Sequence, residues 1–261
     1  MKIGLGIVTY NRKDFFLQAL NSVPTDIVDE IVVVNDGTPY DIGLDEKIKL
    51  IQHEKNTGVG IAKNDALKHL YEVGCDYIFL MEDDIIIKDP TVFEQYIKLH
   101  KASNIHHFNF GYHGPANKTP DKKPNPKLAV NYKEADIKLV MNQHCVGAFS
   151  FYTRECIDKC GYIDEKFINA WEHVEHTYRI IKAGMTTPFW WFADLANSYD
   201  YLDELACSED SSTIRDNPNW KENIIKGNQY FYSKHGCIAV QIPDVGQMEV
   251  IKYVKEQKDG N

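Results

Sequence analysis

The stretch YIFLMEDDIII, residues 77–87, decides the fold predicted for this chain. Its apolar and aromatic start is typical of a buried strand, and the carboxylates Glu82, Asp83 and Asp84 follow before the chain becomes apolar again. Burying a charge is costly unless the charge is paired or bound to a metal ion. Carboxylate oxygens are the ligands that Mg²⁺ and Mn²⁺ prefer, and both ions leave positions open for substrate phosphate. The stretch therefore predicts a metal site at the end of a core strand; an acidic strand end that meets water is the alternative.

The residues around this stretch alternate between strand and helix patterns. Strands are expected at 3–8, 30–34, 48–53 and 77–81, and helices at 15–23 and 58–73. Apolar strands separated by helices of this length indicate βαβ units and a parallel sheet covered on both faces. In such sheets ligands collect beyond the carboxyl ends of the strands. This chain places its polar segments there: TYNR (9–12), NDGT (35–38) and EDD (82–84).

The second half of the chain predicts further, shorter elements. Residues 109–133 are rich in Pro, Gly, Asn and Lys, which predicts an exposed, mobile loop between two halves. Strands are expected at 137–141 and 146–152, and helices at 155–160, from 171 to a C′ glycine at 184, and from 220 to 235 before Gly236. The polar segment 207–219 predicts a linker or a lid.

Composition excludes several classes of protein. The 261 residues suffice for one large α/β domain or two small ones. A formal charge of −9 argues against a protein that binds nucleic-acid backbones. Six cysteines without a CxxC pair favour reduced thiols in a cytoplasmic protein. The sequence shows neither a signal peptide nor an apolar run long enough for a transmembrane helix, which leaves peripheral attachment to a membrane open.

Two segments carry nucleotide-binding patterns. NDGT places Asp36 in a tight glycine turn, where an acidic residue can accept hydrogen bonds from a ribose or base; an ordinary turn is the alternative. NTGVGIAKNDAL (56–67) begins with Asn56 and Gly58 and then becomes helical. Backbone N–H groups at such a helix start suit a diphosphate, and Lys63 could add a cation; a capped helix start is the alternative.

The stretch WEHVEHTYR (171–179) pairs two histidines and two glutamates, each pair three residues apart. Helical geometry predicts an apolar face that packs on the sheet, made of Trp171, Val174, Tyr178 and Ile181. The other side is predicted to carry Glu172, His176 and Arg179, with His173 at its edge. Glu175 and Arg179 have the spacing of an ion pair. A catalytic base, a solvated helix and a zinc site are the three interpretations; zinc is the weakest because HxxH lacks a third partner.

Together these segments resemble the GT-A glycosyltransferases, particularly the inverting family 2, over roughly residues 1–190. The resemblance rests on IVTYNR (7–12), VVNDGT (33–38), NTGVGIAKNDAL (56–67) and the acidic motif. MEDDIIIKDPTVFEQY (81–96) is also similar to the EDD region of N-acetylglucosaminyltransferase I. The resemblance implies a GT-A fold, an α/β Rossmann-like architecture with a mostly parallel central sheet flanked by helices and a smaller acceptor-side half.

The resemblance also implies roles for individual residues. The nucleotide-sugar donor would be bound by Thr9, Tyr10, Asn11, Arg12, Asp36, Asn56, Gly58, Lys63, Glu82 and Asp83. The metal, Mn²⁺ or Mg²⁺, would rely on Asp84. Lys63 departs from the arginine that is more usual in the family, and Met81 stands where many members have their first aspartate.

An inverting transfer needs a side chain that takes the proton of the acceptor hydroxyl. Family 2 members usually carry Glu-Asp in a pattern close to W-G-E-D-x-E-x-x-x-R, and this chain has Glu172 and His173 there, with histidine in the place of the aspartate. The alignment points to His173, and chemistry permits either residue. Glu172 is either the base itself or the group that orients His173.

The implied function is metal-dependent transfer of a hexosyl or N-acetylhexosaminyl group, with inversion, from a nucleoside-diphosphate sugar, expected to be UDP-linked. The acceptor would be a glycan or lipid-linked saccharide in surface polysaccharide assembly, at the inner face of the membrane or in the cytoplasm. The expected parts are a donor half (1–108), the loop (109–133), an acceptor half (134–206) and a C-terminal lid and helical tail (207–261). The alternatives are a nucleotidyltransferase that forms sugar nucleotides, which would need a Gly-rich loop after the first strand, and a non-catalytic nucleotide- or sugar-binding module.

Overall fold

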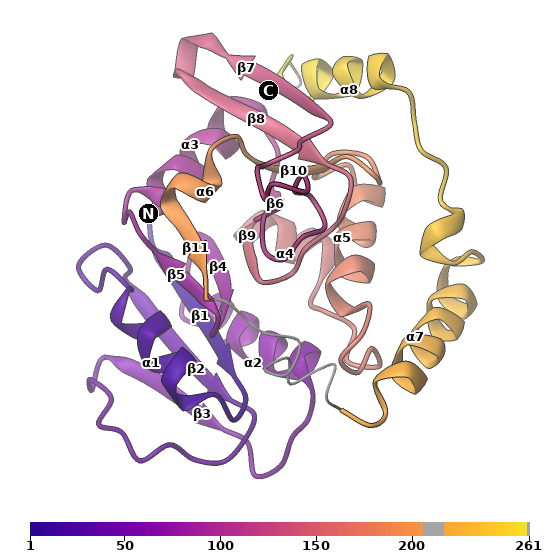
Figure 1. Ribbon diagram of the computed structural model, residues 1–261. Helices are drawn as coiled ribbons and strands as arrows, with labels where there is room; N and C mark the ends of the chain where they lie inside the picture. The colour runs from indigo at the N-terminus through magenta and orange to yellow at the C-terminus, as the bar shows by residue number, and fades with distance from the viewer. Residues whose placement is uncertain (206–216, 260–261) are drawn as a thin grey trace.

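Strand β1 (Ile3–Thr9) lies inside the main sheet of the protein, and all seven of its residues are buried. A computed structural model describes residues 1–205 and 217–259 (Figure 1). The sheet has six strands in the order β3 (Ile48–Gln52), β2 (Glu30–Asn35), β1, β4 (Tyr77–Glu82), β9 (Phe149–Thr153) and β6 (His107–Asn109). Strands β3, β2, β1 and β4 are parallel to one another. Only β9 runs against its neighbours, so the sheet is mostly parallel, as predicted.

Helices cover both faces of this sheet. Successive residues of a strand point to opposite sides, so the apolar residues of each buried strand need a covering layer on both. Ile31 and Val33 of β2 face the layer formed by α1 (Lys13–Asn21) and α3 (Val92–Ser103). Val32 and Val34 face the layer formed by α2 (Val59–Glu72), α4 (Arg154–Cys160) and α5 (Glu172–Lys182). The apolar runs of the sequence thus correspond to strands buried on both faces.

Helix α2 packs against β1 at a place where two glycines leave no room for a side chain. A Cβ atom on Gly6 would lie 2.7 Å from Cβ of Ala66 in α2. A Cβ atom on Gly4 would lie 2.6 Å from Sγ of Cys75, just beyond the end of the helix. The absence of side chains at these two positions fixes how far α2 stands above β1.

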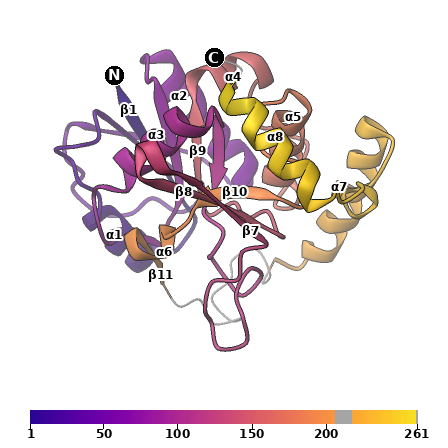
Figure 2. The same cartoon turned by 90° about the horizontal axis from the view of Figure 1, so that it is seen from above.

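A smaller unit made of short antiparallel strands adjoins the main sheet (Figure 2). Its elements are β10 (Phe192–Leu195), β8 (Ile137–Asn142), β7 (Leu128–Tyr132), β5 (Ile85–Ile87), β11 (Leu202–Glu204), α6 (Ser198–Tyr201) and the 3₁₀ turn Lys133–Ala135. Strand β7 lies inside the range 109–133, so the predicted loop is shorter than the sequence suggested. Tyr112 and Asn117 of that range are buried, which also departs from a wholly exposed loop.

The C-terminal part adds α7 (Trp220–His235), the 3₁₀ turn Ala239–Gln241 and α8 (Gln247–Asp259). Helix α7 ends at Gly236 with φ of 75°, and Gly184 follows α5 with φ of 72°, so both predicted terminating glycines are confirmed. Residues 207–216 of the predicted lid lie outside the described part of the chain. Along residues 1–205 and 217–259, no helix combines the length and apolar character needed to span a membrane.

Helix α5 presents a different side to the sheet from the predicted one. The apolar residues Trp171, Val174 and Tyr178 pack in the cluster that contains Phe231 of α7, rather than on the sheet. His176 faces the sheet instead, with its ring stacked 5.4 Å from that of Tyr152 in β9. The prediction failed because a helix with protein on two sides buries polar residues as well as apolar ones.

Asp194 of β10 is a fully buried carboxylate that joins several elements of the smaller unit. It accepts hydrogen bonds from the hydroxyl groups of Tyr96 in α3 (2.6 Å) and Ser198 in α6 (2.7 Å). It also accepts from the backbone N–H groups of Gly111 (2.9 Å) and Leu195 (2.7 Å). Burial disfavours the charged form and raises the pKa of Asp194 to about 7, against the opposing effect of these donors.

We predict that Asp194→Asn destabilises the protein by about 1–3 kcal/mol at pH 8, because an amide NH₂ would face a backbone N–H group that has no other acceptor. The pKa of Asp194 is raised on folding, so its contribution to stability is present below about pH 4 and is lost as the pH rises to about 7. Urea unfolding at pH 5 and pH 8 checks both points, with the exposed Asp200→Asn as the control. If the free energy of unfolding fell by the same amount from pH 5 to pH 8 in the wild type and in Asp194→Asn, the account would be contradicted.

Candidate active site

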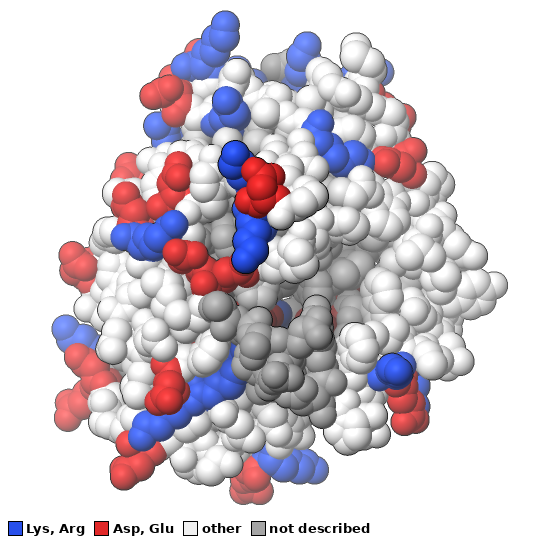
Figure 3. Space-filling view, in the orientation of Figure 1, with Lys and Arg blue, Asp and Glu red and all other residues white. Residues whose placement is uncertain are grey.

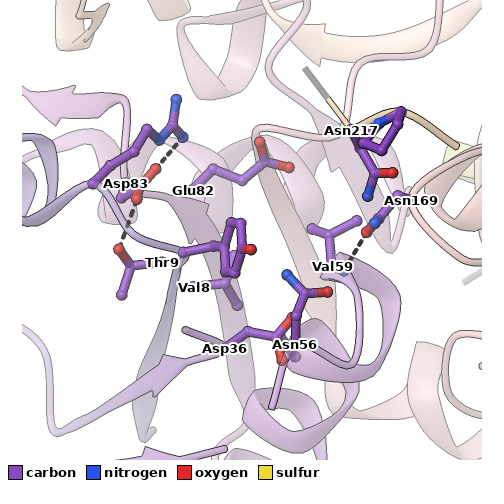
Figure 4. A pocket seen from close by; sticks show the side chains of 13 residues that line it. Val8, Thr9, Asp36, Asn56, Val59, Glu82, Asp83, Asn169 and Asn217 are labelled. Atoms are coloured by element: carbon purple, nitrogen blue, oxygen red, sulfur yellow. Dashed lines mark hydrogen bonds and ion pairs between the residues drawn. The ribbon is translucent and has the colours of Figure 1, made fainter. Parts of the chain in front are cut away.

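A cavity of about 360 Å³ opens at the carboxyl ends of β1, β2 and β4 (Figure 4). Its lining comprises Val8, Thr9, Tyr10, Arg12, Asp36, Asn56, Val59, Ala62, Glu82, Asp83, Asn169, Asn217 and Pro218. Seven residues predicted to bind the donor are on this wall: Thr9, Tyr10, Arg12, Asp36, Asn56, Glu82 and Asp83. The polar segments that follow three separate strands therefore meet in one place, as the parallel sheet requires.

The acidic motif is held by the loop that follows β1. Asp83 accepts a hydrogen bond of 2.7 Å from the Thr9 hydroxyl and forms an ion pair with the Arg12 guanidinium. The same guanidinium contacts Oδ2 of Asp84 at 3.2 Å, so it bridges the two carboxylates. Asp84 lies outside the cavity wall, and Nε2 of His113 is 3.5 Å from its Oδ1. Burial raises the pKa of Asp83 to about 6, against the opposing effect of Arg12.

Asp36 sits at the end of β2 and fixes the start of α2. Its Oδ1 accepts hydrogen bonds from the backbone N–H of Thr57, from the Thr57 hydroxyl and from Nδ1 of His53, each 2.7 Å long. Its Oδ2 accepts the N–H of Gly58 at 2.8 Å. Gly58 was predicted to offer this N–H to a diphosphate, but in the structure the group is used by Asp36.

Asn169 was missed in the sequence analysis, although it lines the cavity (Figure 4). Its Oδ1 accepts the N–H of Val59 at 3.0 Å, so this side chain caps α2 from the loop before α5. The capping group comes from 110 residues further along the chain, and no local pattern marks it. A positive φ of 52° at Asn169 suits asparagine better than most residues.

Asn11 and Lys63, also predicted at the donor, are not on the cavity wall. Asn11 has φ of 53° and accepts the N–H of Thr38 at 2.8 Å, so it supports the NDGT turn from beside the cavity. Lys63 is buried in α2 and donates to Oε1 of Glu82 at 2.6 Å. Lys63 therefore lies behind Glu82 in this structure.

Glu172 and His173, the predicted catalytic pair, are in direct contact at the start of α5. Oε1 of Glu172 is 2.9 Å from Nδ1 of His173, and the carboxylate accepts this hydrogen bond. Only 5% of the Glu172 side chain is exposed, against 26% for His173. Burial would raise the pKa of Glu172, but His173 and Lys63 outweigh it and lower that pKa to about 2. Glu172 is therefore held as a carboxylate at neutral pH.

Glu175 and His176 of α5 are also buried, so a solvated surface helix does not describe this stretch. Glu175 forms the predicted ion pair with Arg179 (3.0 Å) and further pairs with Lys234 and His235 of α7. Nε2 of His176 is hydrogen-bonded to the carbonyl of Gly161. Among the described residues no three His, Cys, Asp or Glu side chains are arranged around a metal position.

A family profile described as Glycosyl transferase family 2 matches residues 5–161 of this chain, more than half of its length. The chain belongs to glycosyl transferase family 2. The match includes the strands β1, β2 and β4 and the acidic motif, and ends just before the loop that leads into α5.

Two curated relatives agree with membership of family 2. An uncharacterized glycosyltransferase of Acanthamoeba polyphaga mimivirus is 24% identical over 246 residues, which cover 88% of this chain and 92% of the relative. The uncharacterized glycosyltransferase YwdF of Bacillus subtilis is 25% identical over 227 residues, with coverage of 79% and 83%.

Solved structures confirm the GT-A-like fold expected of a family 2 member. The fragment 1–349 of S. aureus TarS in complex with UDP-GlcNAc has a TM-score of 0.55 at 15% identity, over 98% of this chain and 71% of that fragment. The complex of the same fragment with UDP gives 0.54 at 16% identity, over 100% and 83%. This chain spans 33% of the longer TarS chain. The similarity of residues 81–96 to N-acetylglucosaminyltransferase I stays a prediction.

The residues around the acidic motif suit a divalent cation in their chemistry and charge. Carboxylates outnumber lysine and arginine side chains here: Asp36, Glu82, Asp83, Asp84 and Glu172 against Arg12 and Lys63. A diphosphate entering such a site needs additional positive charge. The described side chains do not form a finished metal shell, because the guanidinium of Arg12 lies between Asp83 and Asp84. The donor set fits Mn²⁺ or Mg²⁺ provided that Arg12 yields the carboxylate oxygens.

We predict that Asp36→Asn lowers the free energy of unfolding by about 1–3 kcal/mol, because an amide cannot accept from Thr57 and Gly58 on both of its heavy atoms. Asp65→Asn is the matched control: Asp65 shares His53 with Asp36, through a 2.9 Å contact, but is 30% exposed. Its effect should stay below about 1 kcal/mol. Equal losses for the two variants in urea unfolding would show that Asp36 does not anchor α2.

Proposed function

We propose that this protein transfers a hexosyl or N-acetylhexosaminyl group from a nucleoside-diphosphate sugar to the hydroxyl of a saccharide or glycolipid, with inversion. The observation that carries the proposal is the hydrogen-bonded pair Glu172–His173 beside a nucleotide-sized cavity at the strand ends. Membership of family 2 supplies the reaction class. The same fold holds UDP and UDP-GlcNAc in TarS, which supports a UDP-sugar as the donor.

The donor nucleotide belongs in the cavity, between the loop after β1 and the start of α2. Tyr10 and the apolar side chains Val8, Val59 and Ala62 offer a surface for the base. Asn56 and Asn169 offer amide groups for its edge or for the ribose. Asp83 and Glu82 stand at the opposite side of the cavity, where the ribose hydroxyls and the diphosphate reach the end of β4.

A divalent cation, Mn²⁺ or Mg²⁺, is proposed to be held by Asp84 with support from Asp83. When bound, such an ion neutralises the charge that develops on the leaving diphosphate. Arg12 holds both carboxylates in their present orientation and keeps them from repelling each other. Arg12 already lines the cavity, and its release from the carboxylates would free the guanidinium to pair with a phosphate.

His173 is the stronger candidate for the base that takes the acceptor's proton. The Glu172 carboxylate is only 5% exposed and is already in contact with His173 and Lys63, so it is less accessible to an acceptor hydroxyl than His173, which is 26% exposed. Glu172 instead accepts Nδ1–H of His173, which leaves the Nε2 lone pair to receive the proton. Along the described chain Nε2 of His173 makes no hydrogen bond. A carboxylate–imidazole pair thus replaces the aspartate usual in the family.

We predict that His173→Asn lowers kcat/KM for sugar transfer about 10²- to 10⁴-fold. Glu172→Gln should lower kcat/KM less than His173→Asn does. The imidazole keeps its lone pair and loses only its orientation and the electrostatic support of the carboxylate. Initial rates with a nucleotide-sugar donor across pH 5–9 measure both, and His69→Asn on α2 is the control. A much larger loss in Glu172→Gln would make Glu172 the base; full rates in both variants would remove α5 from the reaction.

We predict that Mn²⁺ or Mg²⁺ tightens the binding of UDP to the wild type and that Asp84→Ala loses this increment. The reason is the surplus of carboxylates at the end of β4, which repels a diphosphate unless a cation is present. Calorimetric titration of UDP, with the metal and with EDTA, gives both affinities. Asp26→Ala, an exposed position away from the cavity, should behave as the wild type. Equal affinity for UDP with and without metal would overturn the proposed cofactor.

A further inference from the structure

Lys63 is a buried ammonium group that links the donor side of the site to the base. Only 3% of its side chain is exposed. Its Nζ lies 2.6 Å from Oε1 of Glu82, which lines the cavity, and 3.7 Å from Oε1 of Glu172, which contacts His173. One cation therefore sits between the acidic motif after β4 and the first turn of α5.

A third contact brings Lys63 to the surface on which His173 rests. Nζ of Lys63 donates a 3.0 Å hydrogen bond to the carbonyl oxygen of Gly147. The ring of His173 packs directly on Gly147: a Cβ atom there would lie 2.7 Å from Cγ and 2.9 Å from Nδ1 of the histidine. Lys63 thus holds both the carboxylate that accepts from His173 and the backbone against which the ring lies.

The charges around this group make Lys63 difficult to replace. Burial alone would lower the pKa of Lys63, but Glu82 and Glu172 outweigh it and the pKa is raised, so the side chain stays an ammonium. Without it, two largely buried carboxylates would share one space with no cation between them. Lys63 is also outside the cavity wall, which argues against direct contact with the nucleotide.

We propose that Lys63 is a positioning residue of the transfer reaction: it fixes Glu172 and Gly147, and through them the orientation of His173, relative to Glu82 at the donor cavity. The inference rests on the proposed function, since it assigns a role to Lys63 in that same reaction. It differs from a donor-binding role because Lys63 acts through Glu172 and not on the nucleotide.

The other titratable groups near His173 are neutral and leave this role to Lys63. His107 of β6 faces the same region, and burial lowers its pKa to about 4. Burial raises the pKa of the Cys145 thiol to about 12. Neither group supplies a charge at neutral pH that could replace the ammonium beside Glu172.

The test compares Lys63→Met with Lys63→Arg, which restores a cation, and with Lys63→Gln, which keeps a donor without charge. Lys68→Met is the matched control, because Lys68 is on the same helix and forms a 2.8 Å ion pair with Glu165 at the surface. Thermal melting first identifies the variants that fold. We expect Lys63→Met and Lys63→Gln to lower kcat for transfer about 10- to 100-fold, Lys63→Arg to recover most of it, and Lys68→Met to match the wild type.

A double-mutant cycle with Glu172→Gln separates positioning from donor binding. If Lys63 acts through Glu172, Lys63→Met lowers kcat clearly less in the Glu172→Gln background than in the wild type, with only the part exerted through Gly147 remaining, and the dissociation constant of UDP changes less than about threefold throughout. Independent, multiplicative losses in kcat would overturn the inference. So would a large loss of UDP affinity at unchanged kcat, which would place Lys63 in donor binding.

A readout that needs no turnover keeps this inference distinct from the proposed function. In ¹⁵N-histidine-labelled protein, the Nδ1–H signal of His173, assigned by its loss in His173→Asn, should shift in Lys63→Met and persist in Lys63→Arg and Lys68→Met. A wild type that transfers no sugar from any nucleotide sugar would refute the proposed function, and the reaction role of Lys63 with it. An unchanged Nδ1–H signal in Lys63→Met, alongside an active wild type, would refute the positioning role alone.

Discussion

The structure depends on how it neutralises carboxylates that are taken out of water at the end of β4. Three acidic residues follow one buried strand, and each needs a partner because a lone buried charge is too costly. Arg12, from the loop after β1, serves Asp83 and Asp84 together. Lys63, from α2, serves Glu82 and also reaches Glu172 of α5. The pairing requirement therefore ties the loop after β1, α2 and α5 to one point of the sheet, and the cavity forms between them.

The carboxylates of α5 also need partners, and they find them on two sides of the helix. Glu172 faces the donor half, whereas Glu175, one turn further, is fully buried against Arg179, Lys234 and His235. Two carboxylates on one short helix thus connect it to two different parts of the chain, α2 on one side and α7 on the other. On the face shown in Figure 3, acidic and basic side chains are interspersed over α1 and its neighbours, while much of the surface over α7 is uncharged. Helix α7 is joined to α5 by the contacts of Glu175 with Lys234 and His235 and by the apolar cluster around Phe231.

Much of the fold follows from local features of the sequence. The apolar runs at 3–8, 30–34 and 77–81 predict buried strands, and Gly184 and Gly236 mark helix ends that the structure places as expected. Strand β7 was missed because it has only five residues and sits in a Pro- and Asn-rich segment. The face of α5 that packs on the sheet was misjudged because helical periodicity identifies the apolar side of a helix but does not say that both the sheet and α7 pack against the helix. Asn169 was missed, and Lys63 was expected at the donor without its contact to Gly147, because the partners Val59 and Gly147 lie 110 and 84 residues away in sequence.

The two glycines of β1 give this arrangement an unexpected dependence. Gly4 and Gly6 touch no substrate-facing residue, yet they set the height of α2 above the sheet and hence the origin from which the Lys63 side chain extends. The distance between the cavity and the first turn of α5 therefore depends on how the core packs. A larger side chain at Gly4 or Gly6 would therefore move Lys63, and the Glu82 and Glu172 carboxylates that it contacts, without changing any residue of the cavity wall.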